Sequence, residues 1–492
     1  MAEESVNPSG IDDVGQGIAS TVVRQAGAFL GAEAALDAPR PVTSDISAEP
    51  WPSPARAWYA VFIFALSLMI NFLDRGILTL LVGPIKRDLH LSDSQMGLVM
   101  GFAFVCFYVI LGLPIARLVD FKSRRAIIAV GVTIWSFMTA ICGLARSFGQ
   151  LFLFRIGVGV GEACTGPATY SMLSDLFPKE KLPRAIAFLN FGFYAGTGVA
   201  LIIGGTVTQA LSKMGPVSLP VIGTMYSWQM TFFVVGIPGL IVAALMSTVR
   251  EPKRRGLLAG GTGRGQQQSV KPLPIREVLA FIRANLATYG PLFLGMGVQV
   301  VMVFGLASWG PAFYMRTYQW TPAKYGLILG VFFVTIMPVG AIVGSMLAER
   351  SARKGQDDAN LRIVLLASVI SIPGYVLSPL MPSGTLAVIV SAYALFCGAW
   401  VAGPINAALQ VITPNQMRGQ ITALFLFVFN VIGFGFGPTL VGLITDHVFH
   451  AEDKIRYSMS LVALILGPLA AFVIWRGLRP YGRSVARSKD WA

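Results

Sequence analysis

Four charged residues lie inside otherwise apolar stretches in the first third of this 492-residue chain. They are Asp74, Arg75, Arg155 and Glu162, and their charges sum to zero. A charge is costly to place in a lipid bilayer, so such residues face a water-filled cavity or a partner, and they mark paths for ions or solutes. Two acids and two arginines could bind protons and an anionic solute.

The two acids are candidates for proton binding. A carboxyl in a partly desolvated cavity can take up and release a proton in the physiological range. Asp74 and Glu162 are therefore predicted to be protonation sites. The alternative is a permanent ion pair that only fixes helix packing. Glu162 follows Arg155 by seven residues, which is about two helical turns, so both side chains share one helix face, roughly 10 Å apart.

The two arginines are candidates for binding an anionic group. Arg75 cannot lose its proton, and its planar guanidinium suits a phosphate or a carboxylate. Arg155 is predicted to contact the same kind of group. The alternative is a structural quartet, in which Asp74 pairs with Arg155 and Arg75 pairs with Glu162. Both hypotheses stay open, because each could hold in a different conformation.

Membrane-spanning helices must position these residues. The sequence is 54% hydrophobic and 13% charged, whereas a soluble protein has about 25% charged residues. Apolar runs of roughly 20 residues, enough to cross a bilayer, recur along the chain. They predict an all-α integral membrane protein with many spans, in the inner membrane if the source is bacterial. We place twelve spans near residues 57–85, 95–116, 126–145, 150–177, 185–211, 228–249, 289–315, 325–348, 363–380, 384–412, 419–445 and 457–475.

The net charge of +14 indicates the orientation of these spans. The N-terminal segment, the loops after even-numbered spans and the C-terminal tail hold 28 Lys and Arg, whereas the opposite loops hold 8. Positive loops stay in the cytoplasm, so both termini are predicted to be cytoplasmic, and no nucleic-acid partner is needed to explain the charge. The four cysteines lack the spacing of a disulfide or a metal site, and we expect neither a metal nor a cofactor.

Two polar segments divide the chain into domains. Residues 1–56 lack periodicity and are predicted to be a mostly disordered cytoplasmic segment. Residues 250–288 form a cytoplasmic linker with a Gly- and Gln-rich stretch and a short amphipathic helix. The remaining parts are two halves of six spans each, 57–249 and 289–478, and a basic tail, 479–492.

The two halves repeat each other. After the second span, Asp120 precedes the basic residues Arg124 and Arg125 by four and five positions, and Glu349 precedes Arg353 in the same way after the eighth span. The fourth and tenth spans share a Gly-Pro pair that is followed by a further Pro and an Arg. Parallel halves with a site between them suit alternating access. The loop charges are predicted to be a cytoplasmic gate, which holds neighbouring helices in one state and releases them in another.

These duplicated loops resemble the loop signature of the major facilitator superfamily, and the resemblance covers roughly residues 57–475. The stretches Asn71-Phe-Leu-Asp74-Arg75 and Arg155-Ile-Gly-Val-Gly-Val-Gly-Glu162-Ala narrow it to the Spinster-like branch. The resemblance implies the major facilitator fold of two pseudo-symmetric six-helix bundles. It also implies proton coupling through Asp74 and solutes such as lysophospholipids or sphingoid phosphates.

The charges are confined to the first half of the chain. Spans seven to twelve carry no charge away from their ends and offer few polar groups, among them Gln299 and Asn406. A central cavity would then have one charged wall, with Asn71 and Arg75, and one mostly apolar wall. Such a cavity fits an amphipathic solute whose headgroup meets the arginines.

We therefore expect a proton-coupled secondary transporter, and not an enzyme, that moves an amphipathic lipid-like solute and works as a monomer among membrane lipids. A proton-coupled organic-anion or sugar-acid symporter of the same fold is the alternative, because Asn71-x-x-Asp74-Arg75 also resembles those families. A third possibility is a non-transporting sensor or receptor, which would bind its ligand without accumulating it.

Overall fold

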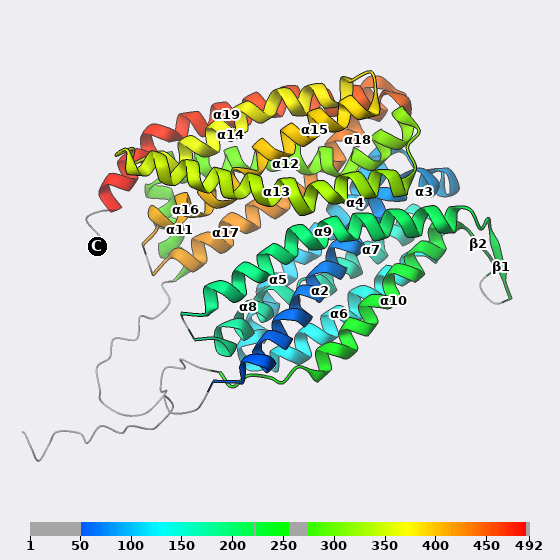
Figure 1. The fold of residues 1–492 in the computed structure, drawn as a ribbon, viewed down its shortest axis with the longest axis horizontal. Coiled ribbons are helices and arrows are strands. Elements are labelled where there is room, and N and C mark those ends of the chain that lie inside the picture. Colours follow the sequence, from blue (N-terminus) through cyan, green and yellow to red (C-terminus); the bar gives the residue numbers. More distant parts are fainter. Residues whose placement is uncertain (1–50, 179, 221–222, 255–273, 415, 489–492) are drawn as a thin grey trace, which may run out of the picture. The chain divides into compact units, whose positions relative to one another are not determined.

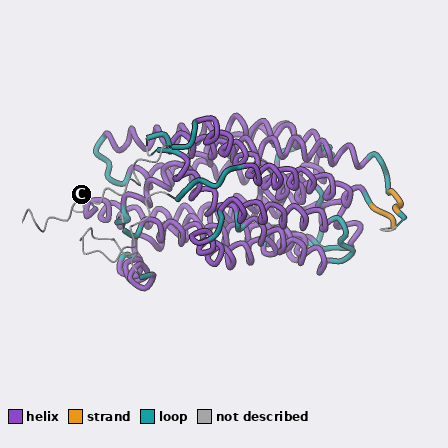
Figure 2. The backbone as a smooth tube through the Cα atoms, turned by 90° about the horizontal axis from the view of Figure 1, so that it is seen from below, coloured by secondary structure: helices purple, strands orange, loops and turns teal. Residues whose placement is uncertain are grey.

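A computed structural model describes residues 51–488 except positions 179, 221–222, 255–273 and 415. The chain divides into two compact units, Met1–Trp51 and Pro52–Ala492, and the second holds every element discussed below. Residues 1–50, which are most of the predicted N-terminal segment, lie outside the described residues. The described part is helical apart from one short hairpin, which lies at one end of the helices in Figure 2.

The first half contains α2 (Pro54–Leu80), α3 (Val82–Leu89), α4 (Asp93–Met100), α5 (Phe102–Phe121), α6 (Arg124–Cys142), α7 (Phe148–Glu162), α8 (Thr165–Leu176), α9 (Leu182–Ser212), the hairpin strands β1 (Val217–Leu219) and β2 (Gly223–Met225), and α10 (Ser227–Thr248). The second half contains α11 (Ile275–Ala284), α12 (Leu286–Tyr318), α13 (Pro322–Arg353), α14 (Ala359–Leu377), α15 (Gly384–Ala399), α16 (Ala402–Val411), α17 (Arg418–Asn430), α18 (Gly437–Ile444) and α19 (Ile455–Ser488). Single turns complete it: η1 (Ser378–Leu380) and η4 (Glu452–Lys454) are 3₁₀ turns, and η2 (Val431–Phe436) and η3 (Thr445–Phe449) are π-helical. Figure 1 shows α12 to α19 gathered beside one another and α2 and α5 to α10 forming a second group.

Eleven helical segments of the described residues are long and apolar enough to cross a membrane. The remaining predicted span, residues 150–177, consists of two helices, α7 and α8, of 15 and 12 residues. Each is shorter than the roughly 20 residues that one crossing requires. The chain turns between them at Ala163 and Cys164, directly after Glu162. The break in this span therefore lies beside one of the predicted protonation sites.

The contacts between the halves indicate a two-fold relation. Helix α9 packs against α13, and α4 and α5 pack against α18 and η2. In the predicted numbering these are contacts of span five with span eight and of span two with span eleven. Exchanging the halves turns each of these contacts into the other, as expected for two bundles related by a pseudo-two-fold axis.

Glycines allow the halves to approach closely at both contacts. A Cβ atom on Gly330 of α13 would lie 2.5 Å from the carbonyl oxygen of Gly198 in α9. A Cβ atom on Gly97 of α4 would lie 2.7 Å from the carbonyl oxygen of Pro438 in α18. Small residues at such crossings let helix backbones pack without intervening side chains. Any larger residue at Gly330 or Gly97 would push the two halves apart.

Helix α11 stands where the linker was predicted to form a short amphipathic helix. Its Val278 is buried, whereas Ile275 and Leu279 are exposed. Helix α19 continues without interruption to Ser488. The part of the predicted tail that the structure describes is therefore helical.

Candidate functional site

The central site begins with adjacent residues of α2 that point in different directions. Asp74 is completely buried, whereas the side chain of Arg75 is 20% exposed, as expected for neighbours on a helix. Nε and Nη2 of Arg75 donate hydrogen bonds to Oε2 of Glu162 at 2.8 and 2.6 Å. The second carboxylate oxygen of Glu162 has no partner among the described residues. One oxygen thus accepts both bonds, and the ion pair joins α2 to the end of α7.

The carboxyl group of Asp74 is held much more loosely. Thr139 of α6 donates a hydrogen bond to Oδ2 at 3.2 Å, and Oδ1 has no hydrogen-bond partner among the described residues. Arg155 donates from Nη1 to the backbone carbonyl of Asp74 at 3.4 Å. The predicted quartet is thus present in part: Arg75 pairs with Glu162, whereas Arg155 meets residue 74 through its backbone.

An aromatic cage surrounds the guanidinium group of Arg75, made of Phe72, Phe104, Tyr108 and Phe434. The Cζ atom of Arg75 lies 4.2 Å from the ring centre of Phe104 and 5.4 Å from that of Phe434. The rings of Phe72 and Tyr108 are at 5.7 and 5.8 Å. A cation over an aromatic face is stabilised by the ring quadrupole. Because Phe434 belongs to η2 of the second half, Arg75 lies where the two halves meet.

None of the four aromatic residues of the cage is among the site residues predicted from the sequence. Phe104 and Tyr108 are four residues apart on α5, and this spacing places two rings on one helix face. That pattern was available from the sequence, but apolar spans contain many such pairs. Only the packing of α5 beside α2 and η2 distinguishes this one.

The predicted polar contacts Asn71, Gln299 and Asn406 are not joined to the charged residues by any described hydrogen bond. Asn71 lies one helical turn before Arg75 in α2 and is 6% exposed. Gln299 of α12 is buried, and its Oε1 atom has no partner among the described residues. Asn406 is exposed and donates to the carbonyl oxygen of Ala402 in its own helix at 2.8 Å. Their contact with a solute stays a prediction.

The basic pair of the first repeated loop joins three elements of the first half. Arg124, only 1% exposed, forms an ion pair with Asp175 of α8. Its Nε donates to Oε1 of Glu251 at 2.9 Å, and its Nη2 donates to the carbonyl oxygen of Pro252 at 2.7 Å. The backbone N–H of Arg125 donates to the other oxygen of Glu251 at 2.8 Å. These contacts fix the start of α6 to α8 and to the segment after α10.

The second repeated loop makes different contacts. Glu349 and Arg353 form a 2.5 Å pair one turn apart on α13, with side chains 61% and 76% exposed. An exposed pair of this kind contributes about 0–1 kcal/mol. The side chain of Asp120 lies outside the described residues. The gate role of these five loop residues therefore stays a prediction.

The contacts of Glu251 lead to a stability prediction. Burial alone would raise the pKa of its carboxyl, but hydrogen bonds from the Arg125 backbone, the Arg124 guanidinium and the Ser123 hydroxyl lower it below the ordinary value. Such a carboxyl stabilises the fold above its unfolded-state pKa, and this stabilisation is lost as pH falls through the folded-state pKa. Glu251→Gln should lower the free energy of unfolding by about 1 kcal/mol at neutral pH.

Thermal unfolding of the purified protein in detergent, followed at several pH values, measures this effect. The difference between Glu251→Gln and the unmodified protein should shrink as the solution becomes acidic. The matched control is Glu349→Gln, which removes the exposed acid of the other repeated loop and should change little. Equal unfolding temperatures for both variants at neutral pH would contradict the prediction.

A second charged group, which we call the outer cluster, joins the two halves. Asp93 of α4 is completely buried, and it forms ion pairs with Lys86 of α3 and with Arg316 of α12. Both terminal nitrogens of Arg316 bind Asp93, at 2.8 and 2.9 Å. Glu452 of η4 lies 2.8 Å from Lys86 and 3.5 Å from Arg316. The cluster also includes Asp446, whose carboxylate accepts hydrogen bonds from the first backbone N–H groups of α4 at 3.2 and 2.6 Å.

The outer cluster is not among the sites predicted from the sequence. Its members lie at the ends of spans, where charges are expected to contact water, and Asp93 is separated from Asp446 by 353 residues. We call the cluster outer because the distribution of Lys and Arg predicts that this end of the protein faces away from the cytoplasm. The outer cluster thus binds the first half to the second at one end. The first half contributes Lys86 and Asp93, and the second half contributes Arg316, Asp446 and Glu452.

The described residues assemble no metal site. No group of three or more His, Cys, Asp or Glu side chains in the described ranges could hold a metal ion. The four cysteines are free thiols, and Cys142 and Cys397 are buried.

Comparison with known proteins places this geometry in a family. Residues 64–438 match the model of the Major Facilitator Superfamily. An "MFS-type efflux pump" of Mycolicibacterium smegmatis is 26% identical, over 88% of this chain and 95% of that relative. "Protein spinster homolog 1" of Xenopus tropicalis is 27% identical, over 79% of this chain and 72% of that relative.

Two further comparisons concern solutes and fold. A probable galactarate/D-glucarate transporter of Bacillus subtilis is 24% identical, over 85% of this chain and 93% of that relative. The crystal structure of a bacterial homolog of the human lysosomal transporter Spinster, inward-facing and unoccupied, has a TM-score of 0.71 at 24% identity and covers 89% of this chain and 99% of that one. The chain is therefore an integral multi-pass membrane protein that belongs to the Major Facilitator Superfamily, a transporter family, and it is similar to the Spinster proteins.

Proposed function

We propose that this protein is a proton-coupled secondary transporter that moves an amphipathic, lipid-like anion by alternating access. The observation that supports the proposal most is the unequal state of the two buried acids. Glu162 is ion-paired with Arg75, whereas the carboxylate of Asp74 has no ion pair among the described residues. A solute that binds Arg75 can thus release Glu162 from its ion pair, and Asp74 can take up a proton.

Competition for Arg75 would couple the proton to the solute. Both donor atoms that Arg75 directs at Glu162 would also suit a phosphate, which a guanidinium binds with two parallel hydrogen bonds. A solute anion on Arg75 would leave the carboxylate of Glu162 without its partner. At an effective dielectric constant of 20, two unit charges 4 Å apart interact by about 4 kcal/mol. A proton on Asp74 or Glu162 removes this uncompensated charge, so anion and proton are favoured together.

The aromatic residues of the second half would accommodate the apolar part of the solute. Phe434 of the cage stacks on Phe304 with ring centres 3.7 Å apart, and Phe304 lies 6.4 Å from Phe429. Further ring contacts continue the series, which we call the aromatic series: Phe434, Phe304, Phe429, Phe425 and Phe293. A hydrocarbon chain could lie along these rings while its headgroup binds Arg75. A sugar acid has no part that needs such a surface, which favours a lipid-like solute.

Transport by the purified protein in liposomes tests the proposal. Uptake of a radiolabelled lysophospholipid and of glucarate is measured with and without a pH gradient. Accumulation of the lysophospholipid only with the gradient supports the proposal, whereas accumulation of glucarate alone would favour the sugar-acid symporter. Ligand binding without accumulation of either solute would indicate a sensor or receptor. Unchanged solute at the end of the assay is expected of a transporter that is not an enzyme.

Arg75→Gln is expected to weaken solute binding by about tenfold to a hundredfold, because a charged hydrogen bond contributes about 1.5–3 kcal/mol. Arg75→Lys keeps the charge but loses the planar pair of donors. Its affinity for the solute should therefore lie between those of the unmodified protein and of Arg75→Gln. The matched control is Arg476→Gln, at an exposed position of α19. Binding of the lysophospholipid is measured in detergent together with the unfolding temperature. Unchanged affinity in Arg75→Gln would reduce Arg75 to a structural partner of Glu162.

A further inference from the structure

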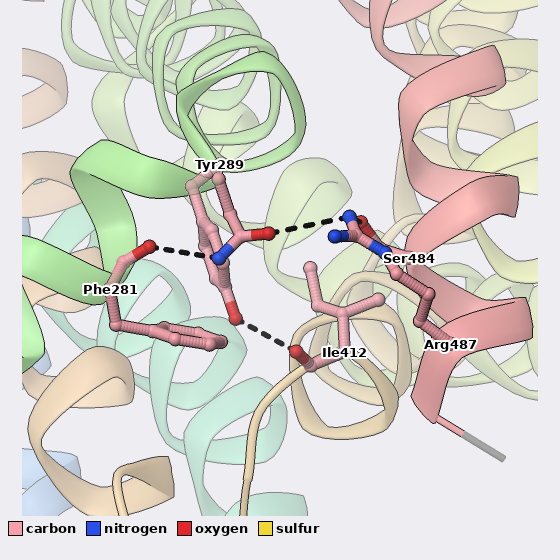
Figure 3. Close-up of a pocket in the computed structure, with 6 residues that line it drawn as sticks. Phe281, Tyr289, Ile412, Ser484 and Arg487 are labelled. Atoms are coloured by element: carbon pink, nitrogen blue, oxygen red, sulfur yellow. Dashed lines mark hydrogen bonds between the residues drawn. The ribbon is translucent and has the colours of Figure 1, made fainter. Parts of the chain in front are cut away.

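A small pocket lies away from the central site, where the end of α11 meets the end of α19. Its cavity volume is about 140 Å³. Figure 3 shows side chains from three helices and from the segment after α16 around it. The lining residues are Phe281, Asn285, Tyr289, Ile412, Ser484 and Arg487.

The pocket has a fixed apolar wall and one cationic group. The hydroxyl of Tyr289 donates to the carbonyl oxygen of Ile412 at 2.9 Å, and this ring is buried. Nη2 of Arg487 donates to Oδ1 of Asn285 and to Oγ of Ser484, both at 3.3 Å, which are long hydrogen bonds. A guanidinium has five N–H donors, and no described carboxylate forms an ion pair with Arg487. Most of its donors are therefore open to an anion.

The helix beside the pocket has the character of a helix at the membrane surface. The apolar side chains of Ile275 and Leu279, one turn apart on α11, are 60% and 49% exposed. Arg276 and Arg283 are exposed beside them on the same helix. A helix with one apolar face and basic residues beside it lies in the headgroup region of a bilayer. The pocket thus opens where phosphate headgroups are concentrated.

We propose that this pocket binds the phosphate headgroup of an anionic phospholipid, with Arg487 as its main partner and the acyl chains in the bilayer beside α11. Basic pockets between membrane helices are known to hold anionic headgroups. The bound lipid would connect α11 to the end of α19 and stabilise that end of the second half. This lipid is distinct from the transported solute, because Arg487 binds Asn285 and Ser484 and no described hydrogen bond or ion pair joins it to Arg75 or Glu162.

The experiment measures the unfolding temperature of the full chain in detergent with added phosphatidylglycerol, phosphatidylcholine or inorganic phosphate. Phosphatidylglycerol should raise the unfolding temperature more than phosphatidylcholine does, and inorganic phosphate should not reproduce this rise. In Arg487→Gln the concentration of phosphatidylglycerol that gives the half-maximal rise should increase about tenfold, which corresponds to 1.4 kcal/mol. The matched control, Arg479→Gln, removes an exposed arginine two turns earlier on the same helix and should keep the response.

Three outcomes would overturn the proposal. They are an equal response of Arg487→Gln and the unmodified protein, an equal response to both phospholipids, and a full response to inorganic phosphate alone, which would identify the ligand as a free anion. Should Arg487→Gln fold poorly, Ser484→Ala provides a second variant, because Ser484 binds the same guanidinium. None of these readouts depends on transport, so failure here would leave the proposed transport function intact.

Discussion

Asp74→Asn is expected to abolish proton-driven accumulation of the solute while leaving the protein folded and able to exchange solute down its gradient. Each pH unit across the membrane can support about a tenfold accumulation for one coupled proton. In the variant, this ratio should fall to about one. Asparagine has nearly the shape of aspartate but cannot take up or release a proton in this range. The contrast between lost accumulation and retained exchange is what identifies a coupling residue.

The contacts of Asp74 explain why the fold should survive. Thr139 donates to the side chain of Asp74, and the carbonyl oxygen of an asparagine amide can accept the same bond. Arg155 binds the backbone carbonyl of residue 74, which the substitution leaves in place. No described ion pair is therefore broken, in contrast to a substitution of Glu162.

Solute uptake and counterflow in liposomes, with and without a pH gradient, measure the effect. The matched control is Asp453→Asn, which removes a 75% exposed carboxylate of η4, outside the central site, and should transport normally. Full accumulation by Asp74→Asn would indicate that Glu162, and not Asp74, couples the proton to solute transport. Loss of counterflow as well would show that Asp74 is needed for the conformational change itself.

The sequence predicted the membrane spans and the four central charges because both follow from strong physical constraints. A bilayer requires long apolar helices, and a charge inside one of them is rare enough to be noticed. The sequence offered the pairs Arg75–Glu162 and Asp74–Arg155 only as one alternative, and the structure has the first pair but not the second. Helical spacing determines the face on which a residue lies, but the partner depends on how α2 and α7 are packed. Arg75 pairs with Glu162, whereas Thr139 donates its hydroxyl to the side chain of Asp74.

The two repeated loops differ in their contacts although their charge patterns match. Their sequences match, so equal roles were expected for both. In the structure, Arg124 is buried among Asp175 and Glu251, whereas Arg353 pairs only along its own exposed helix surface. A loop motif specifies the local charges, but Glu251 lies 127 residues from Arg124 and could not be assigned to it from spacing. The break after Glu162 was missed although Pro167 follows it, a residue that cannot donate a helical hydrogen bond to the carbonyl oxygen of Ala163.

Arg316→Gln is expected to shift the protein strongly toward the conformation that is open on the outer side. Arg316 is the residue of the second half that binds the buried Asp93 of the first half with two hydrogen bonds. Glutamine keeps a polar side chain, but it lacks the positive charge and the two terminal nitrogens with which Arg316 binds both carboxylate oxygens of Asp93. Hydrogen bonds to charged groups contribute about 1.5–3 kcal/mol, so the equilibrium between conformations should change about tenfold to a hundredfold. Lys86 remains beside Asp93 and keeps that carboxylate paired, so the variant should fold.

Accessibility of a thiol in the contact between the halves measures this shift. Thr439 lies against Gly97 in that contact, so Thr439→Cys, in a background in which the four natural cysteines are replaced, places the thiol there. Its labelling by a membrane-impermeant maleimide should be faster when Arg316→Gln is added. The matched control is Arg456→Gln, because Arg456 also binds carbonyl oxygens at this end, but those of Leu380 and Met381 within its own half. Equal labelling rates in Thr439→Cys alone, with Arg316→Gln and with Arg456→Gln would mean that the outer cluster does not hold the halves together. The contact of Gly198 with Gly330 would then be the main contact that keeps the halves closed.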